Sequence, residues 1–254
     1  MRSADELRSL VEDALAELAP HGDLAGLSDA VRYSLEGGGK RIQPVLCLAV
    51  GEALGRDPEE LLPAACAVEL VHSFSLVHDD LPALDDDSLR RGRASTWSHY
   101  GEAIGILAGD ALLAEAFRLA AAYPTTAVVR ELAQATLGMI GGQYLDVTAS
   151  APDLVSLNRL KTGRLFEAAV RCALAACGSE LQAPWREFGQ ELGTLFQLVD
   201  DLLDGDGFVL AYGTETTRQQ ADQAADRALA ALSELDVDAT VLRGLVESVA
   251  TRTA

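Results

Sequence analysis

The sequence predicts an all-α fold, a single-domain bundle of helices. Apolar residues make up 49% of the 254 residues, and Pro occurs only 8 times. Segments with helical periodicity follow one another, punctuated by Gly and Pro, and the alternation typical of a β-strand is not seen. Because no shift in composition and no long linker divides the chain, we expect residues 1–254 to form one domain with an extensive core.

The N-terminal half divides into four expected helices. The first is amphipathic and acidic, the second runs into three consecutive glycines, and the third begins shortly after them. The fourth is long, with Asp57 as its N-cap and Pro58 in its first turn, and Pro63 is a potential break after that turn. These helices cover about residues 4–19, 27–36, 41–53 and 57–81.

Six further helices are expected in the C-terminal half. Gly, Pro or short polar runs bound them, and Pro184 opens the helix that ends in a second acidic stretch. Residues 205–214 contain three glycines and are the expected flexible loop. The six helices cover about residues 96–122, 125–149, 153–177, 184–204, 215–233 and 238–252.

Two groups of aspartates interrupt apolar helices. HDDLPALDDD places five carboxylates within nine residues, and a bend at Pro82 could bring Asp85 back over Asp79. In LFQLVDDLLD, Asp200 and Asp204 are four apart and share one helix face. Each group alone is compatible with a solvated acidic face. Together they favour a multi-Mg²⁺ site for a polyphosphorylated ligand, because carboxylates are natural Mg²⁺ ligands.

Charge and cysteine usage restrict the partners and the compartment. A net charge of −19 argues against nucleic acid or an anionic membrane as a partner. The four cysteines lie among apolar residues without CxxC spacing, which is typical of reduced core residues in a cytoplasmic protein. The first helix has no apolar signal-peptide core, and no run free of charges is long enough to span a bilayer, so no stable membrane association is expected.

The motifs resemble those of the trans-isoprenyl diphosphate synthases (polyprenyl synthetases), most closely the bacterial farnesyl diphosphate synthases. The resemblance covers residues 30–205 in family order. It implies an isoprenoid-synthase-type bundle around a central cavity, a homodimer, and about three Mg²⁺ ions in each active site. The two acidic motifs are HDDLPALDDDSLRRG and FQLVDDLLD, and the other matching segments are GGGKRIQP, GEAIGILAGDALL, GGQYLD and KTG.

This resemblance implies a head-to-tail (1′-4) condensation of isopentenyl diphosphate with an allylic diphosphate, either dimethylallyl or geranyl diphosphate. The allylic substrate loses pyrophosphate, the double bond of isopentenyl diphosphate attacks the resulting cation, and a proton leaves. Mg²⁺ would neutralise the leaving pyrophosphate. The expected metal ligands are Asp79, Asp80, Asp85, Asp200, Asp201 and Asp204.

The resemblance also assigns the substrate contacts. Arg90 would bind the allylic diphosphate, because its planar fork matches phosphate oxygens. His72 lies seven residues before Asp79 and is expected on the same helix face. The residues implied for isopentenyl diphosphate are Lys40, His72 and Arg91, and those near the reacting carbons are Lys161, Thr162 and Gln197. Gln143 and Asp146 are secondary candidates for the far wall of the pocket.

Product length depends on the turn before Asp79. Phe74 and Ser75 lie five and four residues before it, where a growing prenyl tail would descend along the helix. An aromatic ring at Phe74, with the Pro-Ala insertion in the first motif, resembles a C15 synthase and implies farnesyl diphosphate as the product. If the ring points away, the small Ser75 permits a C20 product, geranylgeranyl diphosphate.

Two departures from the family leave other functions open. Gln43 stands where the family has an arginine in its KRxRP segment. The segment after Asp204 is short, and no lysine follows Lys161. These losses are also compatible with a terpene cyclase-like enzyme or with a non-catalytic partner of another prenyltransferase subunit.

Overall fold

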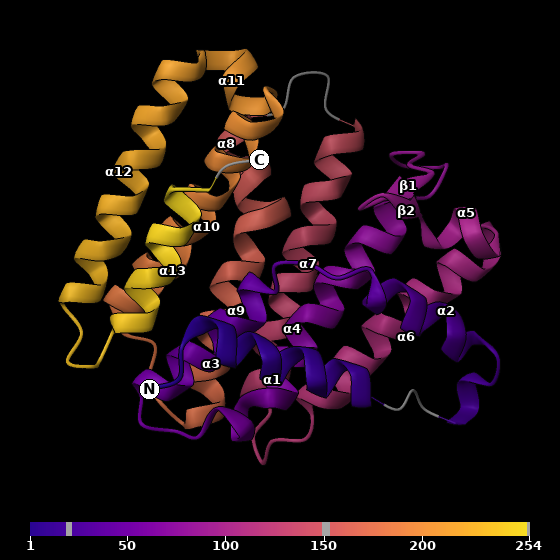
Figure 1. Ribbon diagram of the computed structural model, residues 1–254, viewed down its shortest axis with the longest axis horizontal. Coiled ribbons are helices and arrows are strands. Elements are labelled where there is room, and N and C mark those ends of the chain that lie inside the picture. Colours follow the sequence, from indigo (N-terminus) through magenta and orange to yellow (C-terminus); the bar gives the residue numbers. More distant parts are fainter. Residues whose placement is uncertain (19–21, 149–152, 253–254) are drawn as a thin grey trace.

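The computed structural model describes residues 1–18, 22–148 and 153–252, and it confirms the predicted all-α fold (Figure 1). Its only strands within those ranges form one short hairpin, β1 (Leu89–Arg90) and β2 (Arg93–Ala94). The helices are α1 Ala4–Glu17, α2 Leu27–Glu36, α3 Ile42–Ala53, α4 Pro58–Asp79, α5 Thr96–Tyr100, α6 Glu102–Ala120, α7 Ala127–Thr148, α8 Leu154–Asn158, α9 Arg164–Cys177, α10 Ala183–Asp204, α11 Gly207–Tyr212, α12 Thr214–Ser233 and α13 Thr240–Ala250.

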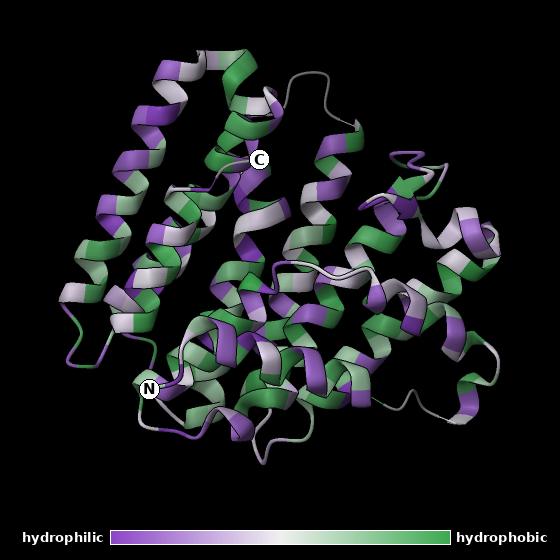
Figure 2. Ribbon diagram, viewed as in Figure 1, coloured by the Kyte–Doolittle hydropathy of each residue, from purple (hydrophilic) through white to green (hydrophobic). Residues whose placement is uncertain are grey.

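The core forms around α3, α4 and α9. α4 packs against α6 on one side and against α3 and α9 on the other, while α10 packs along α12 (Figure 1). Apolar residues of these helices turn inward, and hydrophilic residues lie mostly on the outer helices such as α12 (Figure 2). α4 is long and apolar enough to cross a membrane by length and composition alone, and 67% of that segment is buried inside the fold.

The potential break at Pro63 does not occur, because α4 runs through this proline without interruption. Proline removes a backbone donor and clashes with the preceding turn. The phenol of Tyr123 enters the helix at this point. Its hydroxyl accepts a hydrogen bond from the backbone nitrogen of Ala64 at 3.1 Å and donates one to the carbonyl oxygen of Glu60 at 3.0 Å. A residue some sixty positions away therefore satisfies the backbone that the proline disturbs.

Three other predicted boundaries need correction. The helix expected over 96–122 is two helices, because Gly101 has φ of 92° and interrupts the helical backbone. The helix expected over 153–177 contains a π-helical turn, Arg159–Gly163, between α8 and α9. The expected loop at 205–214 contains the short helix α11, anchored by the buried ring of Phe208.

The hairpin was not predicted, because each of its strands has only two residues. Its turn residues Arg91 and Gly92 have φ of 53° and 77°. A two-residue turn whose twist matches that of its strands requires positive φ at both central residues. The turn presents Arg90 and Arg91 beside the C-terminal end of α4, where the first acidic group lies.

Candidate active site

The first acidic group surrounds the end of α4. The predicted bend occurs, since α4 ends at Asp79 and Asp85 returns to it, its backbone nitrogen donating to the carbonyl oxygen of Asp79 at 2.9 Å. Burial raises the pKa of Asp79 to about 6, and the neighbouring charges of Asp85 and Asp80 act in the same direction. Lys161 and Arg90 oppose that shift. The end of α4 is therefore a place where a bound cation would relieve both burial and repulsion.

Two of the predicted metal ligands are buried and already hydrogen-bonded. Asp80 is 3% exposed and accepts bonds from the guanidinium of Arg90, including one from Nε at 2.9 Å. Asp201 is also 3% exposed, and it accepts one bond from Nε2 of Gln197 at 2.7 Å and one from the backbone nitrogen of Phe208 at 2.8 Å. In this conformation both side chains anchor neighbouring segments, the hairpin and α11.

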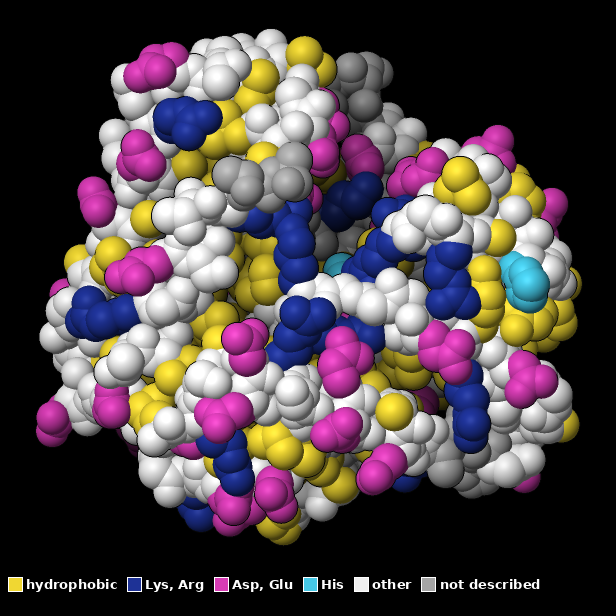
Figure 3. Space-filling model, in the orientation of Figure 1, with side chains coloured by type: hydrophobic (Ala, Val, Ile, Leu, Met, Phe, Trp, Pro, Cys, Tyr) yellow, Lys and Arg dark blue, Asp and Glu magenta, His cyan; other side chains and the backbone are white. Residues whose placement is uncertain are grey.

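A cavity of about 670 Å³ brings six of the predicted residues together. It lies between the start of α3, one side of α4, the hairpin and α10. Figure 3 shows Lys and Arg side chains around a hollow near the centre of one face of the molecule. The cavity therefore combines a basic rim with carboxylates of the second acidic group. The six predicted residues that line it are Lys40, His72, Arg90, Arg91, Asp200 and Asp204.

The basic rim is electrostatically unfavourable without an anion. Burial lowers the pKa of Lys40, and the positive charges of Arg252 and Arg91 add to that effect. Burial also lowers the pKa of His72, again with arginines, Arg91 among them, acting in the same direction. Both lowered pKa values mean that the surroundings disfavour a positive charge on Lys40 and on His72. A bound diphosphate would reverse this balance, because its negative oxygens stabilise every cation around them.

The segment that carries Lys40 is held by a buried ion pair. Arg41 has φ of 49°, and its guanidinium donates to Glu69 inside the core, to Glu12 at 3.0 Å and to the carbonyl oxygen of Leu35 at 2.7 Å. Gly39 has φ of 152°, which favours glycine, and a Cβ atom there would lie 2.8 Å from Nη1 of Arg91, so the end of that arginine would have to move. The glycine-rich segment therefore packs closely against the hairpin.

A second cavity, of about 350 Å³, lies on the other side of α4 and is lined mainly by apolar atoms. Asp79 and Lys161 line it, together with Phe74, Ser75 and Met139 from α4 and α7. The Nζ of Lys161 donates to the carboxylate of Asp146 at 2.6 Å. The cavity thus joins a carboxylate and an ammonium group to an apolar interior, as a prenyl diphosphate requires.

Not all of the predicted residues meet in these two cavities. His72 and Asp79 lie seven residues apart in the uninterrupted helix α4, slightly less than two turns, so they share a face as expected. They nevertheless line different cavities, His72 the 670 Å³ cavity and Asp79 the 350 Å³ cavity. Thr162 lies in the π-helical turn and is among the lining residues of neither cavity within the described ranges.

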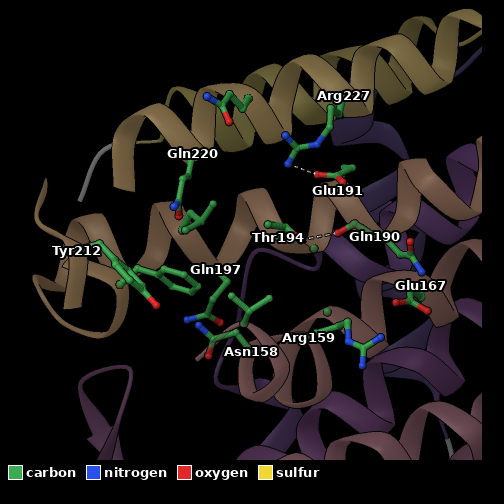
Figure 4. A pocket seen from close by; sticks show the side chains of 16 residues that line it. Asn158, Arg159, Glu167, Gln190, Glu191, Thr194, Gln197, Tyr212, Gln220 and Arg227 are labelled. Atoms are coloured by element: carbon green, nitrogen blue, oxygen red, sulfur yellow. Dashed lines mark hydrogen bonds and ion pairs between the residues drawn. The ribbon is translucent and has the colours of Figure 1, made fainter. Parts of the chain in front are cut away.

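Gln197 faces a third space, a groove of about 530 Å³ between α8, α10, α11 and α12 (Figure 4). Its neighbours there include Asn158, Thr194 and Tyr212. The hydrogen bond to Asp201 connects this groove to the second acidic group. Gln197 thus lines this groove, whereas Lys161 lines the 350 Å³ cavity, and the predicted place of Gln197 near the reacting carbons remains a prediction.

Arg252 is the cavity residue that sequence reasoning missed. Its Nη2 lies 2.9 Å from Oδ1 of Asp200, and it lines the 670 Å³ cavity. The only signal in the sequence was a basic residue near the end of the last helix. Its contact with Asp200 depends on how α13 packs against α10, which no local pattern reveals.

The carboxylates suit Mg²⁺ bound jointly with a phosphate. No group of three or more His, Cys, Asp or Glu side chains in the described part of the chain converges to hold a metal alone. Mg²⁺ usually takes one or two carboxylates and completes its shell with water and substrate phosphates. Asp79 with Asp85, and Asp200 with Asp204, offer oxygen ligands of that kind. The donors therefore fit metal ions that arrive with a diphosphate.

Comparison with known proteins identifies the family. The family model described as polyprenyl synthetase matches residues 25–221. A geranylgeranyl diphosphate synthase of Cyanophora paradoxa is 42% identical over 216 residues, 78% of this chain and 72% of that protein. A farnesyl diphosphate synthase of Geobacillus stearothermophilus is 38% identical over 221 residues, 80% of this chain and 74% of that protein.

A solved structure extends the similarity over nearly all of the fold. The crystal structure of a geranyltranstransferase from Thermotoga maritima is 30% identical, covers 96% of each chain and superimposes with a TM-score of 0.87. The family motifs, the helical architecture and the acidic and basic groups agree with one another. This chain is therefore a member of the polyprenyl synthetase family of prenyltransferases.

Proposed function

We propose that the protein catalyses the Mg²⁺-dependent condensation of isopentenyl diphosphate with an allylic diphosphate to give farnesyl diphosphate. One observation carries this proposal. The helix α4 lines both a basic cavity with carboxylates at Asp200 and Asp204 and an apolar cavity that Asp79 and Lys161 also line. A prenyltransferase needs this combination, because its substrates have a diphosphate head and a hydrocarbon tail.

In this reaction the acidic residues would bind the metal ions, and the basic residues would bind the diphosphates. Mg²⁺, when bound, neutralises the pyrophosphate that leaves the allylic substrate. Asp79, Asp85, Asp200 and Asp204 would hold it, with Asp80 and Asp201 joining only after release from their present partners. Lys161 would orient the allylic diphosphate, since its ammonium group lies at the edge of the apolar cavity.

The basic cavity would bind isopentenyl diphosphate. Lys40 and Arg91 have no hydrogen bond or ion pair with another described residue, so their charges are available to an anion. His72 lies deeper on the same wall, where its lowered pKa favours the neutral ring that can still donate one hydrogen bond. Arg90 spans the hairpin and the acidic group, and it would reach the allylic diphosphate on leaving Asp80.

Phe74 supports a C15 product. Its ring is 8% exposed, lies on the wall of the apolar cavity and packs edge-on against His78, with ring centroids 4.9 Å apart. A ring in this wall shortens the space that a growing tail can fill. The similar proteins include both geranylgeranyl and farnesyl synthases, so a C20 product is the competing outcome.

A homodimer is part of the proposal. Large apolar side chains are exposed together on α6 and α7, with Leu137 70% exposed, Tyr144 66% and Val147 59%. On α6, Ile106 is 45% exposed and Leu107 50%, and water solvates such exposed apolar side chains poorly. A second copy covering these side chains would remove them from water. Sedimentation at micromolar concentration tests this, and a monomer would contradict it.

We also propose a cytoplasmic location, without stable membrane association or nucleic-acid binding. All four cysteines are free thiols, and burial raises the pKa of Cys66 and Cys172 to about 12, which suppresses their reactivity. The negative net charge of −19 supports the absence of polyanionic partners. Fractionation of cells producing the protein would check the location.

A product assay tests the proposed function directly. Purified protein, Mg²⁺ and isopentenyl diphosphate are incubated with dimethylallyl or geranyl diphosphate, and product length is read by mass spectrometry. A C15 product is expected, and EDTA should abolish it. A C20 product would retain the reaction and reject Phe74 as the limit. Hydrocarbon without consumption of isopentenyl diphosphate would indicate a cyclase-like enzyme, and no reaction would indicate a non-catalytic partner.

A further inference from the structure

Arg252 lies just beyond α13, with its side chain inside the 670 Å³ cavity. Its Nη2 is 2.9 Å from Oδ1 of Asp200, and its guanidinium carbon lies 5.3 Å from the ring centroid of Phe196. The side chain is only 20% exposed. The guanidinium is therefore held within the cavity by an ion pair and a ring contact, and it does not extend into solvent.

This guanidinium has unused hydrogen-bond donors. Its Nε and Nη1 atoms are buried and have no hydrogen-bond partner among the described residues. Leaving a buried charged donor unpaired is costly, and the guanidinium fork matches two oxygens of a phosphate. The unused edge of Arg252 thus has the chemistry of an anion-binding group.

The surroundings of Arg252 point to the same ligand. Lys40 and Arg91 line the same cavity, and the charges of Arg252 and Arg91 help to lower the pKa of Lys40, after burial. Gln43, which is 7% exposed, lines the cavity as well and brings no charge. The positive charge that the resemblance expects at Gln43 is thus absent there, and Arg252 supplies one from another wall.

We propose that Arg252 binds the diphosphate of isopentenyl diphosphate in place of the arginine that Gln43 replaces. This inference rests on the proposed function. In the absence of metal, Asp200 is the resting partner of Arg252. If Asp200 served as a Mg²⁺ ligand, its ion pair with Arg252 would be released, and the guanidinium would be free to turn both of its edges to the diphosphate.

The test measures isopentenyl diphosphate binding by calorimetry, with Mg²⁺ present and no allylic substrate, so that no turnover occurs. Arg252→Gln should weaken this binding about ten- to a hundredfold, the range for loss of a charge-assisted contact. Arg252→Lys should weaken it less, because the charge remains. Arg243→Gln is the matched control and should have no effect, because Arg243 lies on α13 with its guanidinium bonded to Ser233.

A double variant tests whether Arg252 takes the role of the arginine that Gln43 replaces. Gln43→Arg, added to Arg252→Gln, should recover most of the lost affinity for isopentenyl diphosphate. Mg²⁺ binding with geranyl diphosphate present and isopentenyl diphosphate absent gives a second readout. Arg252→Gln should leave it unchanged or strengthen it, since a cation competing for Asp200 is gone. A side chain that only maintained the fold would weaken both kinds of binding, and neither would return with Gln43→Arg.

The outcomes separate this inference from the proposed function. If the unaltered protein does not bind isopentenyl diphosphate, the proposed function is wrong. If the unaltered protein binds it and Arg252→Gln binds it within about twofold, only the role of Arg252 is wrong. If Arg252→Gln lowers the melting temperature, the double variant decides, since a folded double variant that does not regain affinity also overturns the role.

Discussion

The backbone nitrogen of Asp85 donates a hydrogen bond to the carbonyl oxygen of Asp79 across 2.9 Å. This contact closes the bend after α4 and holds two carboxylates on the same short segment. Burial raises the pKa of Asp79 to about 6, with Asp85 contributing. The metal-free protein therefore keeps an unfavourable negative charge at the place where the reaction would need a cation.

Replacing Asp79 with Asn should stabilise the metal-free protein and abolish turnover. The pKa of Asp79 is higher in the folded chain than the ordinary value of 3.8, so the folded form is favoured when this group is protonated. Its contribution to stability therefore falls as pH rises from about 4 to about 6. At pH 8 the variant should gain about 1 to 3 kcal/mol in the free energy of unfolding.

Urea unfolding in EDTA at pH 8 and pH 4 measures this gain as the difference between variant and unaltered protein. The difference should become much smaller at pH 4, where Asp79 is protonated in the folded chain and close to half protonated in the unfolded chain. An equal difference at the two pH values would show that the charge of Asp79 is not its cause.

Replacing Asp200 with Ala should reduce turnover at least about a hundredfold, because a metal ligand stabilises the charge of the leaving group. The fold should survive, since Asp200 is partly exposed and a lost ion pair of that kind is worth only about 1 kcal/mol. Steady-state kinetics and circular dichroism check both expectations. Asp222→Ala, an exposed acid on α12, is the control. Retained turnover in Asp200→Ala would reject its assignment as a metal ligand.

Changes at Phe74 and Ser75 should move product length in opposite directions. Phe74→Ala opens the wall of the apolar cavity and should shift the product beyond its original length. Ser75→Phe adds a ring to the same cavity and should shorten the product. Mass spectrometry of the extracted diphosphates reads both results. An unchanged product in the two variants would show that the tail does not pass along this side of α4.

Gly142→Ala should lower activity far more than Gly141→Ala, the adjacent substitution in the same helix. A Cβ at Gly142 would lie 2.7 Å from the backbone nitrogen of Lys161, whereas a Cβ at Gly141 meets nothing within 4 Å. The first change must displace the π-helical turn that carries Lys161. The second only removes a flexible residue from a helix and should stabilise it by about 0.5 to 1 kcal/mol.

Kinetics and thermal melting of both glycine variants separate positioning from folding. The expected pattern is a reduced kcat in Gly142→Ala at a melting temperature within a few degrees of the unaltered protein. Equal kcat in the two variants would mean that the position of Lys161 is not critical.

Much of the fold was predictable because helix signals are local. Asp57 caps α4, accepting a hydrogen bond from the backbone nitrogen of Glu59 at 3.1 Å, and Pro58 follows in the first turn. Both features are predictable from a few neighbouring residues in the sequence. The bend after Asp79 follows equally from Pro82. The acidic motifs and the basic segments were recognisable for the same reason, since each motif is contiguous in the chain.

Other features depend on residues that are distant in sequence. The hydroxyl of Tyr123 forms hydrogen bonds with the backbone beside Pro63, and the potential break in α4 does not occur. In their motifs, Asp80 and Asp201 look like carboxylates available to a metal. In the fold, Asp80 accepts a hydrogen bond from Arg90, and Asp201 accepts one from the backbone of α11. No propensity or spacing contains this information, because the partner of a buried polar group is chosen by packing.

The composition, the helical periodicity and the contiguous motifs were sufficient for the all-α class, the family resemblance and most of the charged residues around the cavities. Packing assigned each side chain to its space. It put His72 and Asp79 in different cavities, turned Gln197 to a groove beside α12 and brought Arg252 to Asp200. The reason is physical: helix formation depends on neighbours within a turn or two, whereas a binding site depends on helices that meet only when the core is buried.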